Sequence, residues 1–350
     1  MQRLIFWGIK LVKDQIFHRM SVETQEKVRT IVLGKPRTIG WYARRVALVT
    51  PPILLVASAY EKSPFSGYYR MVMMLPEDEK QIGDTSSQTL LAQLTKSHVL
   101  VPSHHPVYKR VTNVVTRLDV AIREMLNERS NESVWDASQY LPDEWRIFII
   151  SSNEFNAFVL PNGDIFLNSE VLNYIRNDDE LATILSHEIG HKLARHTAAK
   201  LTFNGIFFLL DSFFMVTLAL VLPLPVFIEP LINELRGLVI PYLIQLPYSR
   251  SLELEADYIS VLLMSKACYN ATAAAELWDR LSREKKLTKA DRGLMDLMST
   301  HPHPSLRAEK ISSWRQEAAE IFNNNATCRT FLDDFHRVEA YYRIHSIRSK

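Results

Sequence analysis

Apolar residues recur at helical spacing in the middle of the chain. One set is separated by steps of three or four residues, the period of one helix face. Its members are Val107, Val111, Val114, Leu118, Ile122 and Met125. A second helical pattern begins at Asp178, and Asp178 or Asp179 is expected as its N-cap. The spacing therefore predicts helices over both stretches.

Three short stretches between these helices have the character of strands. Trp145 to Ser151 is a strand candidate, rich in Ile and aromatic residues. Asn156–Leu160 and Ile165–Leu167 flank the sequence Pro-Asn-Gly-Asp, in which Asn162-Gly163 is a hairpin signal. The pattern predicts an α+β fold that is predominantly α-helical, with a small sheet that includes this hairpin.

An uncharged stretch, Val46–Tyr60, follows Arg44 and Arg45. A full membrane crossing takes about 20 apolar residues, and Pro51-Pro52 would kink a helix here. The arginines can extend the segment by reaching toward the lipid headgroups. We expect residues 46–60 to be an N-terminal membrane anchor; the alternative is a buried core segment.

Charge is distributed unevenly along the 350 residues, although the net charge is only +2. Residues 1–45 carry ten Lys/Arg against three acids, typical of an organelle targeting segment; the alternative is a basic surface helix. Residues 61–87 are predicted to be a linker, and residues 88–345 the compact domain. The near-neutral total gives no case for a nucleic-acid partner.

The sequence His187-Glu188-Ile189-Gly190-His191 has the form HExxH. On a helix, residues four apart share a face, so His187 and His191 can bind one zinc ion. Glu188 then lies beside the open metal position as a general base. The alternative is a pair of histidines on the surface of a charged helix.

A catalytic zinc site needs a third protein ligand. Glu253 and Asp257 are four residues apart and share a helical face, whereas Glu255 is rotated by about 200° from Glu253. One carboxylate can bind the metal while Asp257 accepts a hydrogen bond from a ligand histidine. By itself, such an acidic helix is more often a solvated face.

HEIGH followed by SRSLELEAD resembles the zinc metallopeptidase family that includes the CAAX prenyl proteases and bacterial heat-shock membrane proteases. The resemblance implies a gluzincin-type domain with an active-site helix. It implies one Zn²⁺ per subunit, bound by His187, His191 and Glu253, with Glu188 as catalytic base. Asp257 falls on the position that supports a ligand histidine.

Two further motifs resemble the same family. Asn156-Ala157-Phe158 resembles its edge strand, onto which substrate backbone adds as another strand. Thr300-His301-Pro302 with Arg307 resembles its C-terminal motif. The resemblance implies that His301 stabilises the oxyanion and that Arg307 organises the site.

Within the family, LPYSR, ADYIS and MSKAC resemble a mitochondrial inner-membrane branch. This implies an endopeptidase facing the intermembrane space, with the lipid bilayer and inner-membrane proteins as partners, among them the dynamin-like fusion GTPase as a substrate. The chain has no GxxxxGK[ST] motif, so proteolysis without a nucleotide is expected. A homo-oligomer remains open. The alternatives are an endoplasmic-reticulum prenyl-protein protease and a non-catalytic, zinc-stabilised membrane scaffold.

A hydrophobic insert, residues 201–248, separates His191 from Glu253. Both residues must meet at one metal, so the insert must cross a membrane zero or two times. Glu234 and Arg236 are costly in lipid. We expect a re-entrant or membrane-lying flap; the alternative is an ordinary helical hairpin.

The chain has two cysteines, Cys268 and Cys328. If the domain faces the intermembrane space, its compartment supports disulfides. We predict a Cys268–Cys328 disulfide; the alternative is two unrelated thiols.

Overall fold

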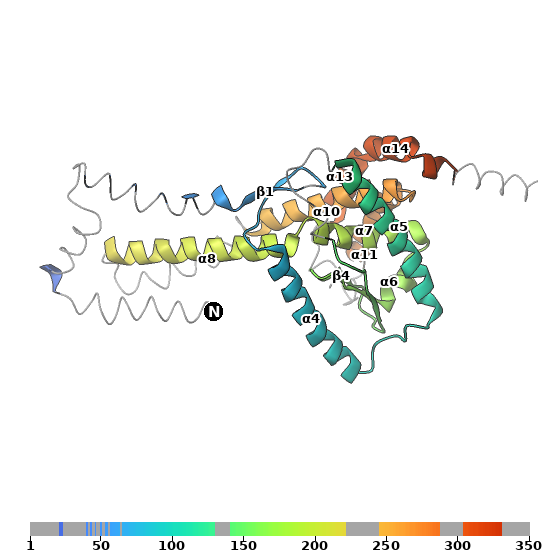
Figure 1. Ribbon diagram of the computed structural model, residues 1–350, viewed down its shortest axis with the longest axis horizontal. Helices are drawn as coiled ribbons and strands as arrows, with labels where there is room; N and C mark the ends of the chain where they lie inside the picture. The colour runs from blue at the N-terminus through green and yellow to red at the C-terminus, as the bar shows by residue number, and fades with distance from the viewer. Residues whose placement is uncertain are drawn as a thin grey trace, which may run out of the picture. The chain divides into compact units, whose positions relative to one another are not determined.

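A computed structural model describes most of the chain between residues 57 and 330. The described residues are 21–23, 40, 43, 46, 50, 53–54, 57–63, 65–129, 141–221, 245–287 and 304–330. They fall into two compact units, whose helices are labelled in Figure 1. The large unit takes in residues 63–68, 74–197 and those from 249 onward, and the small unit takes in the remainder.

The large unit consists mainly of helices around a three-stranded sheet. Its helices are α4 (Pro76–Lys96), α5 (Pro106–Arg129), α6 (Ser169–Tyr174), α7 (Asp178–Leu193), α10 (Leu246–Lys266, whose first turn belongs to the small unit), α11 (Thr272–Leu287), α13 (Pro304–Ser313) and α14 (Arg315–Asn324). Its strands are β3 (Ile147–Ile150), β4 (Ala157–Val159) and β5 (Ile165–Asn168). The predicted α+β class with helices in the majority is confirmed.

The sheet has the strand order β3-β5-β4. β3 runs parallel to β5, and β4 runs antiparallel to β5, with Phe158 opposite Phe166. The hairpin turns at Gly163, whose φ of +94° favours glycine. A Cβ there would also come within 2.3 Å of Pro142. The predicted strand and hairpin are therefore confirmed.

The core of the large unit forms where α5 and α7 contact each other and the sheet. α5 contacts α7 and β3, and α7 also contacts β4 and α11. The predicted apolar face of α5 is buried from Val111 to Met125. α7 is buried on nearly all sides over Leu181–Gly190, so it lies inside the unit rather than on its surface.

Two local predictions differ from the structure. The N-cap of α7 is Asn177, whose side chain accepts from the backbone of Glu180, rather than Asp178 or Asp179. The stretch 76–87, predicted as linker, forms the first half of α4. The sequence of this stretch is polar although part of it is buried, because its buried side chains make polar contacts. One of them is the ion pair of Glu79 with Arg195 at 2.8 Å.

The small unit contains strands β1 (Tyr60–Lys62) and β2 (Tyr69–Met71), paired antiparallel, and helix α8 (His196–Val221) from Ala198 onward. Ala59, Met71 and Ile206 form its buried apolar cluster. None of the described helices combines the length and apolar content of a membrane crossing. About half of the predicted anchor, nearly all of the targeting segment and residues 222–244 of the insert lie outside the described residues.

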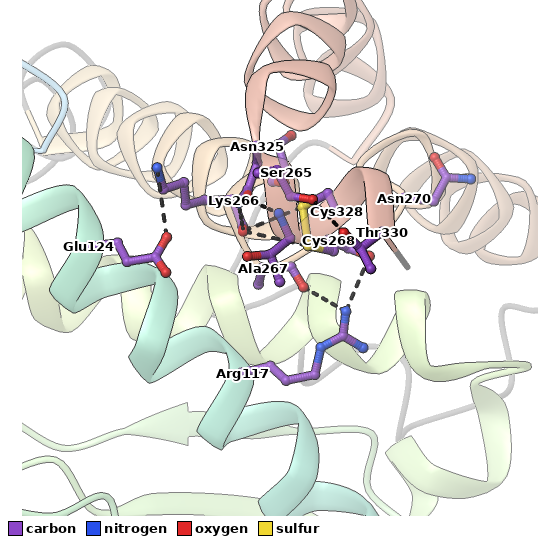
Figure 2. The surroundings of a disulfide bond; sticks show 12 residues. Arg117, Glu124, Ser265, Lys266, Ala267, Cys268, Asn270, Asn325, Cys328 and Thr330 are labelled. Carbon is purple, nitrogen blue, oxygen red and sulfur yellow. Dashed lines mark hydrogen bonds and ion pairs between the residues drawn. A yellow bond between two sulfur atoms is a disulfide. The ribbon is translucent and has the colours of Figure 1, made fainter. Parts of the chain in front are cut away.

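Cys268 and Cys328 are joined by a disulfide that ties the end of α10 to the segment after α14 (Figure 2). The same corner is held by Arg117 of α5, which donates to the carbonyls of Ala267 and Cys268 at 2.6 and 3.2 Å. The Asn325 side chain donates to the Lys266 carbonyl at 2.9 Å. The C-terminal end of α10 is thus fixed from two directions.

Removing the disulfide should destabilise the large unit. The cysteines are separated by 60 residues, and closing a loop of that size contributes about 4 kcal/mol in the chain-entropy model. The double variant Cys268→Ser, Cys328→Ser should lower the free energy of unfolding by a comparable amount in urea denaturation. Reductant should lower it in the wild type and have no effect on the double variant. An equal response of both proteins would contradict the prediction.

Candidate active site

The site is built where α7 crosses α10. A Cβ added to Gly190 of α7 would lie 3.0 Å from the carbonyl oxygen of Ala256 on α10. That distance is tighter than side chains usually allow, so the missing side chain permits the close approach. The crossing brings the HExxH segment against the acidic segment of α10.

Three side chains converge at this crossing. The Nε2 atoms of His187 and His191 lie 3.1 Å apart. Each faces a carboxylate oxygen of Glu253 at 3.5 Å. These ligand atoms all lie within 4.8 Å of one another, and among the described residues they form the one such group.

The chemistry of these atoms fits a zinc ion. Two imidazole nitrogens and a carboxylate oxygen are zinc's usual catalytic ligands, and this set leaves the fourth position open. His187 and Glu253 are 1% and 2% exposed. Burying a carboxylate this deeply is costly unless a cation neutralises it. The three predicted ligands are therefore brought together in an arrangement suited to the metal.

Asp257 supports His187 from behind. Its Oδ1 lies 3.0 Å from the Nδ1 of His187, the nitrogen that faces away from Glu253. Arg307 donates to both Asp257 oxygens, at 2.7 and 2.6 Å. The Arg307 guanidinium in turn stacks over Trp278, 3.6 Å from the ring centroid. Arg307 thus fixes the carboxylate of Asp257, which in turn contacts the candidate ligand His187. This position is consistent with the predicted role of Arg307 in organising the site.

The electrostatics separate the two histidines. Burial and Arg307 favour neutral His187, but the Asp257 and Glu253 carboxylates raise its pKa to about 9. Burial lowers the pKa of His191 well below its ordinary value, with Glu253 opposing in part. Burial acts to raise the pKa of Asp257, yet Arg307 and His187 lower it overall. Metal-free at pH 7.5, His187 therefore carries a proton and His191 does not.

Glu188 follows His187 on α7 and is 4% exposed. It is one residue from a candidate ligand, as the general-base prediction requires. His301 lies outside the described residues, so its predicted part in oxyanion stabilisation stays a prediction.

The predicted substrate strand lies at the edge of the sheet. Among the described strands, β4 pairs only with β5, which leaves its other edge open. Phe158 packs on Phe166 with ring centroids 5.1 Å apart, and the Asn156 carbonyl accepts from Asn168 at 3.0 Å. β4 contacts α7. Ala157 and Phe158, and Asn156 just before them, therefore lie on or beside a strand that packs directly on the HExxH helix.

Three buried residues beside the site have no counterpart in the sequence prediction. Trp278 covers Arg307 and lies edge-on to His187, with ring centroids 5.8 Å apart. His196 contacts the ring of His191. Glu255 contacts His196. From the sequence, the position of Glu255 on another helix face excluded it as a metal ligand but gave it no other role. No motif in the sequence distinguishes Trp278 from a core aromatic residue.

Comparisons with known proteins agree with this geometry. The family model "Peptidase family M48" matches residues 122–315. The chain is 30% identical over 269 residues to the mitochondrial metalloendopeptidase OMA1 of Saccharomyces cerevisiae, covering 76% of this chain and 72% of that protein. It is 29% identical to the Schizosaccharomyces pombe protein of that name, over 70% of this chain and 63% of that one.

A human relative, "Metalloendopeptidase OMA1, mitochondrial", is 31% identical over 206 residues, covering 58% of this chain and 38% of the human protein. The matched region in the family model contains both α7 and the acidic segment of α10. More than half of the sequence is thus accounted for by one family model, and the chain belongs to peptidase family M48.

Proposed function

We propose that the protein is an ATP-independent zinc metalloendopeptidase of the mitochondrial inner membrane that cleaves membrane proteins in quality control and the stress response. The single observation that carries the chemistry is the convergence of His187, His191 and Glu253 beside Glu188. The mitochondrial assignment is supported by the names of the relatives. The membrane assignment is supported by the uncharged stretch 46–60.

The proposed mechanism divides the work among the residues of the chain. A zinc ion bound by the three ligands would supply a Lewis acid for the water and for the scissile carbonyl. Glu188 accepts the proton of the attacking water and passes it to the leaving amine. The open edge of β4 takes up the substrate as an extended strand, since backbone hydrogen bonds bind peptides of varied sequence.

A prenyl-protein protease would share this chemistry but is less supported by the relatives. A non-catalytic scaffold would have no use for a buried carboxylate beside the ligands. Glu188 is only 4% exposed and directly follows a candidate ligand on α7, the place where a hydrolytic site needs its general base.

The first prediction from the proposed function concerns metal content. The purified full-length protein should contain about one zinc per chain, as a single catalytic site requires. Glu253→Ala should lose most of this zinc because one of three ligands is removed. Asp257→Ala should weaken the affinity for zinc by about 10–100-fold. Elemental analysis and chelator competition provide the measurements. Full zinc retention by Glu253→Ala would exclude Glu253 as a ligand.

The second prediction follows from the pKa of His187, about 9 in the metal-free protein. Zinc needs the neutral imidazole, so binding at pH 7.5 should displace about one proton. The apparent affinity should therefore rise about tenfold per pH unit from pH 7 toward the pKa and level off above it. Calorimetry in buffers of different ionisation enthalpy counts the protons. Zinc affinity that does not change over this pH range would show that His187 is already neutral.

The third prediction separates catalysis from metal binding. Glu188→Gln should retain zinc and the fold, because the amide is close in shape to the carboxylate. It should lose peptide cleavage by at least about 100-fold, since the amide cannot accept the proton of the water. Cleavage of a membrane-protein substrate and zinc content are measured on the same preparation. Wild-type turnover in this variant would refute the mechanism.

A further inference from the structure

The two candidate histidine ligands are supported by different groups. His187 contacts the carboxylate of Asp257 directly. His191 instead presents its Nδ1 to the Nδ1 of His196, at 2.7 Å. Nε2 of His196 lies 3.1 Å from Oε2 of Glu255, and the Ser66 hydroxyl hydrogen-bonds the other oxygen of Glu255. Two contacts thus lead from His191 to a carboxylate on α10, and a third joins that carboxylate to Ser66.

With Glu255 ionised and His196 neutral, the hydrogen positions along these contacts follow from the carboxylate end. An ionised carboxylate only accepts, so Glu255 accepts from Ser66 and from Nε2–H of His196. A neutral His196 with its hydrogen on Nε2 has a lone pair on Nδ1, which can only accept from Nδ1–H of His191. His191 then has its lone pair on Nε2, the atom that faces Glu253. The contacts therefore select the tautomer that a metal needs at this position.

The placement of His196 depends on a break between two helices. Residues five apart on a continuous helix lie about 140° apart around its axis, so His196 would point away from His191. The backbone of Arg195 instead has a φ of +54°, in the left-handed region. This conformation is unfavourable for a residue with a side chain. Arg195 is held in it by Glu79 at 2.8 Å and by the Met74 carbonyl at 2.6 Å.

Burial makes the contacts difficult to replace by water. His196 is 2% exposed and Glu255 is 3% exposed. Removing one member leaves a buried polar partner without its hydrogen bond, which is costly. The arrangement therefore holds the ring of His191 in one orientation.

We propose that Ser66, Glu255 and His196 form a hydrogen-bond relay that fixes the ring and tautomer of His191 and thereby sets the affinity of the metal site; this rests on the proposed zinc function. His196 and Glu255 are positioning residues, since they act through His191. The relay is the counterpart of the direct Asp257 contact at His187. Groups of this kind typically change metal affinity by about 10–100-fold.

The test compares variants of the full-length chain by zinc competition with a chelator. His196→Leu fills the space without an acceptor and should weaken zinc by about 10–100-fold. His196→Asn places an amide oxygen near the position of Nδ1 and should recover part of this loss. Glu255→Gln keeps the volume but removes the charge, and should give a loss of about tenfold. Cobalt-substituted protein should show altered visible absorption bands in the same order.

Glu180→Gln is the matched control. Glu180 is also buried at α7 and pairs with Arg280 at 2.6 and 2.8 Å, at the other end of the helix from His191. It should lower thermal stability yet change zinc affinity by less than about twofold, as expected for a distant site. If the relay residues were merely structural, their variants would follow this pattern.

The possible outcomes distinguish failure of the relay from failure of the proposed zinc function. Tight zinc binding by the wild type with unchanged affinity in folded His196→Leu and Glu255→Gln would overturn the relay alone. Failure of the wild type to bind zinc would overturn the proposed function and the relay together. If His196→Leu does not fold, the ranking of His196→Asn and Glu255→Gln against Glu180→Gln decides the question.

Discussion

The close crossing of α7 and α10 is the constraint on which the site depends. Gly190 has no side chain, and a Cβ there would lie 3.0 Å from the Ala256 carbonyl and 3.4 Å from its Cα. The neighbours of Ala256 on α10 are thereby placed within reach of the histidines of α7. A Cβ at position 190 would require the backbone at Ala256 to give by a few tenths of an ångström, and a shift of α10 would carry its carboxylates with it.

The helix α10 thus supplies three carboxylates that have different roles. Glu253 faces the Nε2 atoms of both candidate ligand histidines, and Asp257, one turn later, faces the opposite nitrogen of His187. Glu255 lies on another face of α10, where it contacts His196. Three buried carboxylates in one small volume would repel one another strongly in a medium of low dielectric constant. Arg307 pairs closely with Asp257, at 2.6 Å, and more distantly with Glu253, at 3.8 Å, so a cation bound between Glu253 and the two histidines would complete the compensation.

The sequence predicts those parts of the structure that follow a regular period. The helical face of α5, the Asn162-Gly163 turn and the i, i+4 pairs on α7 and α10 depend only on local geometry, and the structure contains them. The polar residues of α4 do not reveal their burial, because their partners are distant: Glu79 contacts Arg195 across 116 residues. His196 could not be placed from spacing at all. Its position depends on the left-handed backbone of Arg195, an exception to helical periodicity.

The register of α10 links the site to the rest of the large unit. Cys268 lies 15 residues after Glu253, a distance of about 22 Å along a helix, so the disulfide does not touch the candidate ligands. Its influence on them passes through the rigid helix between them, which is buried over most of Leu252–Ser265. The hydrogen bonds from Arg117 to the carbonyl groups at this corner do not involve the sulfur atoms, so they do not depend directly on the disulfide. The disulfide therefore acts on the stability of the unit first, and on the geometry of the site only to the extent that α10 shifts as a whole.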